Sequence, residues 1–270
     1  MSTGASDTSE WAAVANQAAP SWYLDALVGR QKREVHQRFV RDCARGLKPR
    51  TVLKTDVFEE AFGSDQILFD LLPEARLTVG MDIAPEAVGG AAGRAPGSGF
   101  SFLAADVRRL PFRAEAFDLV ISTSTLDHFT LRGDLQVALR ELVQVLRPGG
   151  RLVITLDNPW NPMFFLLRAW SHTRWCPFPL GHTMSLAELT RSLEAQGMRV
   201  LATDWLIHNP RLVSTLLFVG LRRLMGARAD VPIRALLKFF GLFAHLPTRR
   251  LTACFIAACA RKPEVAEQPI

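Results

Sequence analysis

Two aspartates stand where a ligand that contains a ribose and a base would need them. Asp82 ends the apolar run RLTVGMD, and Asp106 ends the run FSFLAAD. Taken alone, each aspartate is explained as well by a structural role, as a helix N-cap or a turn residue. Together they are more specific, because the carboxyl ends of parallel strands meet at one edge of a sheet, where ligands bind. A carboxylate at the first position can accept hydrogen bonds from a ribose diol, and one at the second can accept from the exocyclic amino group of a base.

Alternating strands and helices must hold these residues in place. Short apolar runs predict strands at 51–54, 76–82, 100–106, 117–124 and 151–157, and the stretches between them predict helices, including one that ends near Leu72. Ser185 and Glu188 fit a capping box at the start of a later helix, which leads to a strand over 198–206. Residues 251–262 read as the last strand. The pattern predicts an α/β fold whose mostly parallel sheet is covered by helices on both faces.

The composition is that of a globular protein with one large domain. Of its 270 residues, 49% are hydrophobic and 21% are charged, and no shift in composition marks a linker. The net charge of +6 arises in residues 200–270, which hold ten basic and four acidic residues. Such a bias is typical of a solvated helical face or of attraction to an anionic surface. The four cysteines lack metal-ligand spacing, and neither a secretory signal nor an apolar run of about 20 residues is visible, which predicts a cytoplasmic protein.

Four short motifs follow one another between about residues 50 and 160: GMDIAP, AADVRRLPF, FDLVISTSTLDH and LRPGGRLVIT. In this order and spacing they resemble the class I S-adenosylmethionine-dependent methyltransferases, in particular the small-molecule branch. The resemblance implies a Rossmann-like, doubly wound sheet of seven strands with the last strand antiparallel. It also implies that S-adenosyl-L-methionine is the cofactor. The implied cofactor-binding residues are Asp56, Gly63, Asp82, Ile83, Asp106, Val107 and Thr123.

The loop after the first predicted strand departs from this family. Family members carry a glycine-rich turn there, which lets the backbone approach the methionine portion of the cofactor. Here the stretch KTDVFEEAFG (54–63) keeps only Gly63 and places Lys54 where the family has an acidic residue. Asp56, Glu59 and Glu60 either reach the amino group of the cofactor or form the acidic first turn of a helix. The departure leaves an alternative function, a non-catalytic relative that binds a ligand or partner without methyl transfer.

His128 is the candidate catalytic base. It follows the fourth predicted strand in LDHF, where the resemblance implies a histidine that faces the cofactor. The usual pKa of histidine suits proton acceptance from an acceptor hydroxyl near neutral pH, whereas the competing reading is a packing or helix-start histidine. Asp157, Asn158 and Trp160 are the candidate substrate contacts, at the end of the fifth predicted strand. The other histidines are scattered, and no metal site is predicted.

Three segments outside the sheet are expected to cover the site. They are residues 1–50, an N-terminal helical lid, and insertions at about 158–184 and 207–250 within a methyltransferase domain of 51–262; residues 263–270 read as a flexible tail. The aromatic residues of this roof are Phe164, Phe165, Trp170, Trp175, Phe178 and Trp205. An apolar roof favours methyl transfer, most often to oxygen, on a small apolar or lipid-like acceptor, and it disfavours nucleic acid as a partner.

The apolar helices predicted at 211–226 and 234–245 admit two readings, because a helix that is apolar over most of its surface must be buried against something. As a lid they would pack against the carboxyl edge of the sheet. As a membrane foot they would dock on a bilayer, with Arg222 and Arg223 making the contact sensitive to salt. We expect the lid, and peripheral membrane contact through 211–245 is the alternative. The sequence assigns neither the acceptor nor the oligomeric state.

Overall fold

Seven strands form one sheet in the computed structural model, which describes residues 25–63, 66–72, 74–171 and 180–264. The strand order is β3-β2-β1-β4-β5-β7-β6. The parallel part consists of β1 (Thr51–Thr55), β2 (Leu77–Asp82), β3 (Phe100–Ala104), β4 (Phe117–Thr123) and β5 (Leu146–Asp157). β7 (Phe255–Arg261) runs antiparallel to β5 and to β6 (Arg199–Leu206). The predicted seven-stranded, mostly parallel sheet with an antiparallel last strand is confirmed.

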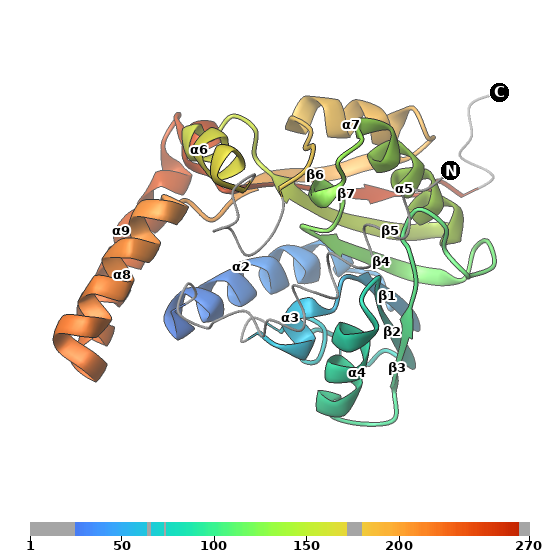
Figure 1. Cartoon of the computed structure of the whole chain (residues 1–270). Coiled ribbons are helices and arrows are strands. Elements are labelled where there is room, and N and C mark those ends of the chain that lie inside the picture. Colours follow the sequence, from blue (N-terminus) through green and yellow to red (C-terminus); the bar gives the residue numbers. More distant parts are fainter. Residues whose placement is uncertain (1–24, 64–65, 73, 172–179, 265–270) are drawn as a thin grey trace.

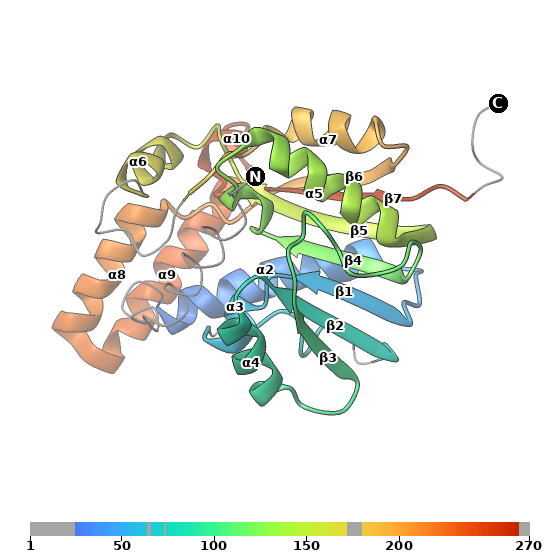
Figure 2. The same cartoon turned by 45° about the vertical axis from the view of Figure 1, so that its right-hand side comes forward.

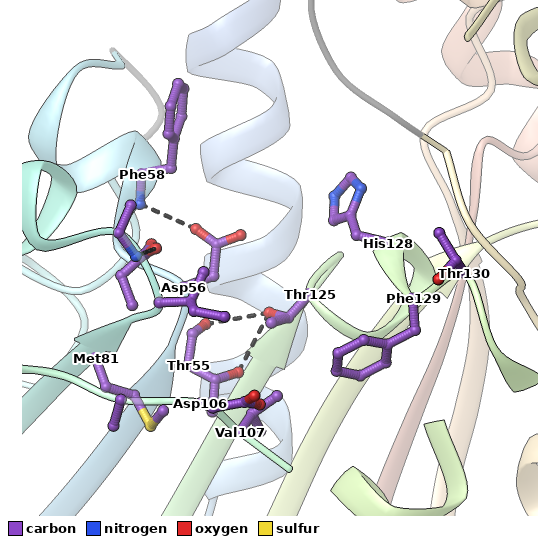
Figure 3. Close-up of a pocket in the computed structure, with 14 residues that line it drawn as sticks. Thr55, Asp56, Phe58, Met81, Asp106, Val107, Thr125, His128, Phe129 and Thr130 are labelled. Atoms are coloured by element: carbon purple, nitrogen blue, oxygen red, sulfur yellow. Dashed lines mark hydrogen bonds between the residues drawn. The ribbon is translucent and has the colours of Figure 1, made fainter. Parts of the chain in front are cut away.

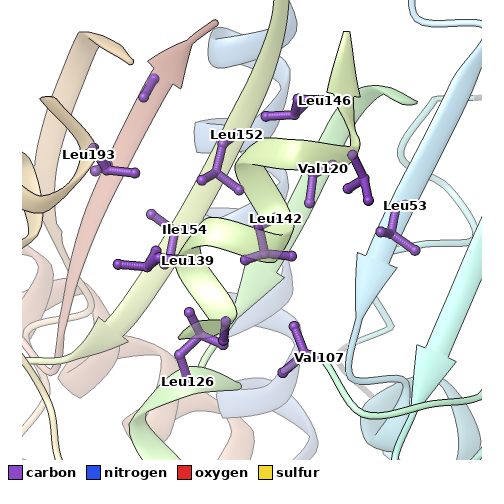
Figure 4. Close-up of a cluster of buried hydrophobic side chains, with 14 of the residues drawn as sticks. Leu53, Val107, Val120, Leu126, Leu139, Leu142, Leu146, Leu152, Ile154 and Leu193 are labelled. Carbon is purple, nitrogen blue, oxygen red and sulfur yellow. The ribbon is translucent and has the colours of Figure 1, made fainter. Parts of the chain in front are cut away.

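Helices cover both faces of the sheet, as the alternation of its strand residues requires. On β4, Val120 belongs to a buried cluster with α5 (Arg132–Val145) and α7 (Leu186–Glu194). Its neighbours Leu119 and Ile121 belong to another cluster with α2 (Ala26–Ala44). Figure 1 shows α5 and α7 on one side of the sheet and α2 on the other, and Figure 4 shows the α5 side of the core. The sheet is therefore doubly wound.

Local signals in the sequence account for several helix ends. The side chain of Asp25 accepts a hydrogen bond from the Leu27 amide at 2.9 Å and so caps α2, which ends just before Gly46 with its φ of +78°. Ser185 and Glu188 form the predicted capping box at the start of α7. Pro85 begins α4 (Pro85–Arg94), where its fixed φ suits the first helical turn.

Three predicted boundaries were wrong. The helix expected to reach Leu72 is only α3 (Phe58–Ala61). It ends early because the Glu60 carboxylate accepts hydrogen bonds from the amides of Ile67 and Leu68, at 3.0 and 2.9 Å. β5 begins at Leu146 rather than 151, because residues 146–150 continue beside β4 through an irregular register. The last strand begins at Phe255, because residues 249–252 form the short helix α10 (Arg249–Thr252).

Two helices of the second insertion form a hairpin that projects from the sheet (Figures 1 and 2). α8 (Arg211–Met225) leads through a short 3-10 turn (Gly226–Ala229) into α9 (Asp230–Gly241), and a second 3-10 turn follows (Leu242–His245). Phe218, Ile233 and Leu237 form a small core between the two helices and α2. No helix among the described residues is both long and apolar enough to cross a membrane. Another insertion holds α6 (Pro162–Ser171).

Candidate functional site

A cavity opens at the carboxyl ends of the first four strands, next to the point between β1 and β4 where the strand order reverses (Figure 3). Thr55 is the last residue of β1 and Asp82 the last of β2, while Asp106 and Thr125 each follow their strand by two residues. The register aligns these ends, since Thr55 lies opposite both Met81 and Ser122. The lining residues are Thr55, Asp56, Phe58, Met81, Asp82, Ile83, Ala84, Ala105, Asp106, Val107, Thr125, His128, Phe129 and Thr130.

Asp56 adopts a backbone conformation in the first loop that glycine favours. Its φ of +72° lies in the left-handed region, which glycine adopts most easily and which aspartate tolerates better than most residues. Its carboxylate accepts a hydrogen bond from the Phe58 amide at 2.9 Å, and this bond fixes the turn (Figure 3). Burial raises the pKa of Asp56, and the nearby Lys54 opposes that rise. The loop thus reaches the cavity with a carboxyl group instead of bare backbone.

A buried ion pair supports this loop from below. Lys54 and Glu60 are both almost fully buried, and the lysine ammonium lies 2.8 Å from the Glu60 carboxylate. The ammonium also donates to the backbone oxygen of Asp56. Glu59, in contrast, pairs with Lys32 of α2 at 3.1 Å. The three acidic residues of the loop therefore have separate roles, and of the three only Asp56 lines the cavity.

Asp82 is held so that its carboxylate stays at the cavity wall. One oxygen accepts from the Val57 amide at 3.0 Å and the other from the Ala84 amide at 2.9 Å. Each carboxylate oxygen keeps lone pairs for a further donor. Burial, followed by the charge of Asp56, raises the pKa of Asp82 to about 7. Two neighbouring carboxyl groups with raised pKa values favour a ligand that carries positive charge.

Asp106 has a partner of its own at the end of β3. Arg108 meets both of its carboxylate oxygens, with distances down to 2.7 Å, and the same guanidinium binds Asp134 at 2.7 Å. Arg108 also stacks over the ring of Phe129, 5.2 Å from its centroid. This network fixes the orientation of Asp106, and a base amino group would share the carboxylate with Arg108.

His128 lies across the cavity from Asp56, at the end of a 3-10 turn (Leu126–His128) (Figure 3). Its imidazole is 4.0 Å from a carboxylate oxygen of the buried Asp127. Asp127 accepts from the Asp157 amide at 2.6 Å, and burial together with the Asp157 charge raises its pKa to about 6. Between the two sides, the Thr125 hydroxyl donates to the Thr55 carbonyl at 3.2 Å and so closes the floor of the cavity.

Five predicted site residues lie outside the cavity lining. Gly63 ends the loop of α3, where its carbonyl accepts from Arg94. Thr123 stays within β4, and Thr125 two residues later lines the cavity instead. The buried Asp157 forms an ion pair with the partly exposed Arg211 at 2.8 Å, while the Asn158 amide donates to the carbonyls of Arg250 and Ala253. Trp160 is largely exposed. Asp157 and Asn158 therefore contact residues of the second insertion, and Trp160 faces solvent.

The predicted aromatic roof lies partly within the described residues. Phe164 is buried in α6, whereas the adjacent Phe165 is exposed, and Trp205 packs partly buried against the main core. Trp175 and Phe178 lie outside the described residues, as does the side chain of Trp170. Every described residue that lines the cavity falls between Thr55 and Thr130, so the α8–α9 hairpin does not contribute to its wall. Within the described part of the chain, no cluster of three metal-ligating side chains occurs.

The sequence missed several lining residues, among them Thr55, Met81, Thr125 and Phe129. Thr55, Met81 and Thr125 each lie next to a predicted strand end, and Phe129 directly follows the 3-10 turn after β4. The signal that would find them is therefore position, because all side chains at the carboxyl edge of a parallel sheet border the same crevice. Residue type gives no such signal, since a threonine or methionine at that place is ordinary in a core.

This strand order, with a reversal at β1 and β4 and an antiparallel β7 inserted between β5 and β6, defines the class I methyltransferase fold. Residues 59–154 match the family model of the methyltransferase domain. An N-methyltransferase NodS from Bradyrhizobium japonicum, solved with S-adenosyl-L-homocysteine, superimposes with a TM-score of 0.56 at 18% identity over 93% of this chain and all of that one. Residues 59–154 thus match a methyltransferase domain, and the chain has the class I methyltransferase fold.

Curated relatives match only a short part of the chain. A demethylmenaquinone methyltransferase of Mycolicibacterium paratuberculosis is 40% identical over 74 residues, which are 25% of this chain and 31% of that protein. A tRNA (carboxymethyluridine(34)-5-O)-methyltransferase of Arabidopsis thaliana is 40% identical over 73 residues, which are 27% of this chain and 18% of that protein. The chain thus spans less than a third of the length of these relatives, and their named substrates differ.

Proposed function

We propose that this protein transfers a methyl group from S-adenosyl-L-methionine to a small apolar or lipid-like acceptor, most often at an oxygen. The observation that carries the proposal is the meeting of Asp56, Asp82 and Asp106 on one cavity, each from a different strand end. The match to the methyltransferase domain over residues 59–154 supports it independently.

The side chains around the cavity fit this cofactor by their chemistry. Asp82 offers free lone pairs to a ribose diol, and Asp106 stands one strand further along for the base, with Ile83 and Val107 as apolar neighbours. Asp56 lies at the end of β1, where the ammonium of the methionine portion would find a carboxylate. Glu60 balances the charge of Lys54. The carboxyl groups of Asp56 and Asp82 therefore give the cavity a net negative charge that suits a cationic ligand. When bound, the cofactor supplies an electrophilic methyl group on a sulfonium.

His128 is proposed as the base that takes the proton from an acceptor hydroxyl. It lines the cavity opposite Asp56, with 19% of its side chain exposed, so an acceptor that enters from this side meets the imidazole. Methyl transfer from a sulfonium otherwise needs mainly in-line placement and exclusion of water. Thr125 and Phe129 form the part of the wall that would position the acceptor.

An apolar acceptor suits the wall on this side, where Phe129 and Val107 accompany the threonines. The demethylmenaquinone methyltransferase among the relatives is named for an acceptor of this kind, which supports the same class. The alternative is a methyltransferase-fold protein that binds a ligand or partner without methyl transfer. The observation that favours it is the replaced glycine turn, in which the Asp56 side chain occupies the wall where family members have bare backbone.

Calorimetric titration with S-adenosylmethionine tests the proposal. The wild type should bind, and Asp82→Ala should weaken binding about 10- to 100-fold, because a hydrogen bond to a charged group contributes about 1.5–3 kcal/mol. Asp70→Ala removes an exposed carboxylate outside the cavity and serves as the matched control. Binding without any methyl transfer, or no binding at all, would favour the non-catalytic alternative. An unchanged affinity in folded Asp82→Ala would contradict the site.

A further inference from the structure

The α8–α9 hairpin carries an apolar surface that the rest of the described chain leaves uncovered. The exposed side chains of α8 and of α9 recur at helical spacing. Each helix therefore buries one face in the small core with α2 and exposes the opposite face. Leu224 is 85% exposed and Val231 is 75% exposed, one on each side of the turn that forms the tip. The hairpin surface consists of Val213, Leu216, Leu217, Leu224, Met225, Val231, Phe239 and Leu242.

Basic residues surround this surface. Residues 211–250 contain eight Arg or Lys residues and a single acidic residue, Asp230. Arg222 and Asp230 bind each other at 2.5 Å, and Arg222 also binds Asp25 of α2, so these charges hold the hairpin in place. The exposed cations beside the apolar stripes are Arg223, Arg228, Arg234 and Lys238.

We infer that the hairpin surface docks on an anionic lipid bilayer, with the tip around Leu224 and Val231 entering the headgroup region. Exposed aliphatic side chains at a projecting tip, ringed by cations, match the two requirements of a peripheral membrane contact, apolar burial and attraction to anionic lipid. Nucleic acid fits less well, because the most exposed apolar residues are aliphatic and offer no ring for base stacking. The inference stands apart from methyl transfer, although a membrane-bound enzyme would meet a lipid-like acceptor there.

This surface agrees with the membrane contact that the sequence left open beside the lid. Leu216 and Met225 of α8 are exposed at 64% and 43%, so the sheet does not cover them. Phe240 packs with Phe218 and Leu237, whereas its neighbour Phe239 is 53% exposed. A charge at position 240 would therefore disturb the fold, and the test must use the exposed positions.

Flotation of the purified protein with vesicles of phosphatidylglycerol and phosphatidylcholine tests the inference. The wild type should float with anionic vesicles, float poorly with pure phosphatidylcholine, and lose binding as salt rises. Leu224→Asp/Val231→Asp should reduce the bound fraction at least tenfold. Arg223→Glu/Lys238→Glu should reduce affinity at least about 25-fold, because each basic residue near an anionic surface contributes about a factor of five.

Matched variants keep the result specific. Leu131→Asp/Leu201→Asp adds two charges at exposed leucines outside the hairpin, and Arg113→Glu/Arg140→Glu reverses two exposed cations elsewhere. Both should bind vesicles like the wild type, and circular dichroism should show every variant folded. Failure of the wild type to float at low salt would overturn the inference, as would equal losses in the controls. If the protein does not float but forms a dimer that Leu224→Asp/Val231→Asp abolishes, the surface binds a second copy of the chain instead. If it does not float but binds tRNA in a way that depends only on Arg223 and Lys238, the surface binds nucleic acid instead.

Discussion

At the scale of single residues, the electrostatics of the cavity depend on carboxyl groups that lie close to one another and are shielded from water. Burial raises the pKa of both Asp82 and Asp56, and the charge of Asp56 raises that of Asp82 further, whereas Lys54 opposes the rise at both sites and His128 opposes it at Asp56. A cation that enters the cavity stabilises the ionised form of both carboxyl groups, so these groups favour a positively charged ligand.

The raised pKa of Asp82 makes stability depend on pH. In the folded chain its pKa is about 7, whereas the ordinary value is 3.8, so the folded state holds a proton that the unfolded state has released. Stability should therefore fall as pH rises from about 4 to 7, with a slope of at most about 1.4 kcal/mol per pH unit from one group. Asp82→Asn should flatten this decline in urea unfolding measured at pH 5, 6, 7 and 8. Asp127, with its pKa raised to about 6, leaves a residual slope, and a variant slope equal to the wild type would refute the assignment.

His128→Ala should separate binding from chemistry. If the imidazole takes a proton from the acceptor, its loss should slow methyl transfer about 10²- to 10⁴-fold and leave the affinity for S-adenosylmethionine within about twofold. Incorporation of label from radiolabelled cofactor into a bacterial lipid extract gives the rate, and calorimetry gives the affinity. An affinity that falls as far as the rate would show that His128 acts on cofactor binding or packing instead.

At this scale, the sequence predicted which residues lie at the ends of strands, but it gave little information about the residues that they contact. Asp82, Asp106 and His128 line the cavity. Their positions were predictable because apolar runs mark the strands that precede them. The conformation of Asp56 was not predictable, because it depends on the contact between Lys54 and Glu60, which lie at opposite ends of a loop with no periodic signal. Asp157 and Asn158 were placed at the mouth by strand position alone, and nothing in the sequence indicated their distant partners Arg211 and Ala253.

At the scale of elements, the first loop depends on a buried ion pair. Lys54→Met should destabilise the protein by about 3–5 kcal/mol, because it leaves the Glu60 carboxylate buried without its cation. Lys54→Met/Glu60→Gln should recover part of that loss. Lys32→Met breaks the more exposed pair with Glu59 and should cost no more than about 1 kcal/mol. Urea unfolding measures all three, and a loss below about 1 kcal/mol for Lys54→Met would show that the pair does not support the loop.

The elements themselves were predictable where periodicity was strong and misjudged where a side chain competes with the backbone. The strands of the parallel sheet, α5 and the α7 capping box follow directly from apolar patterns. The expected helix to Leu72 fails because Glu60 captures two amides that a helix would use. Helices apolar over most of their surface gave no sign of which stripe is buried, since burial in the hairpin is decided by contact with α2.

At the scale of the whole molecule, Arg222 fastens the hairpin to the sheet domain through α2. Arg222→Met removes the bonds to Asp25 and Asp230, so hydrogen exchange over residues 211–241 should quicken by about tenfold, with β5 unchanged. Arg234→Met removes an exposed cation 3.7 Å from Asp230 and should leave the exchange pattern as it is. Equal protection of the hairpin in Arg222→Met and wild type would show that the apolar core with α2 is sufficient.

The position of β7 has a consequence for synthesis on the ribosome. β6 pairs in the sheet with β7 alone, yet β7 follows it by about fifty residues. While the nascent chain is still being translated through the hairpin, β6 has no partner strand, and one edge of β5 also stays open. The parallel strands β1 to β5 can assemble first, and the remaining two must enter together once residues 255–261 emerge. A translational pause within 211–250 would therefore expose two strand edges at once, at the stage when a nascent chain is most open to chaperones.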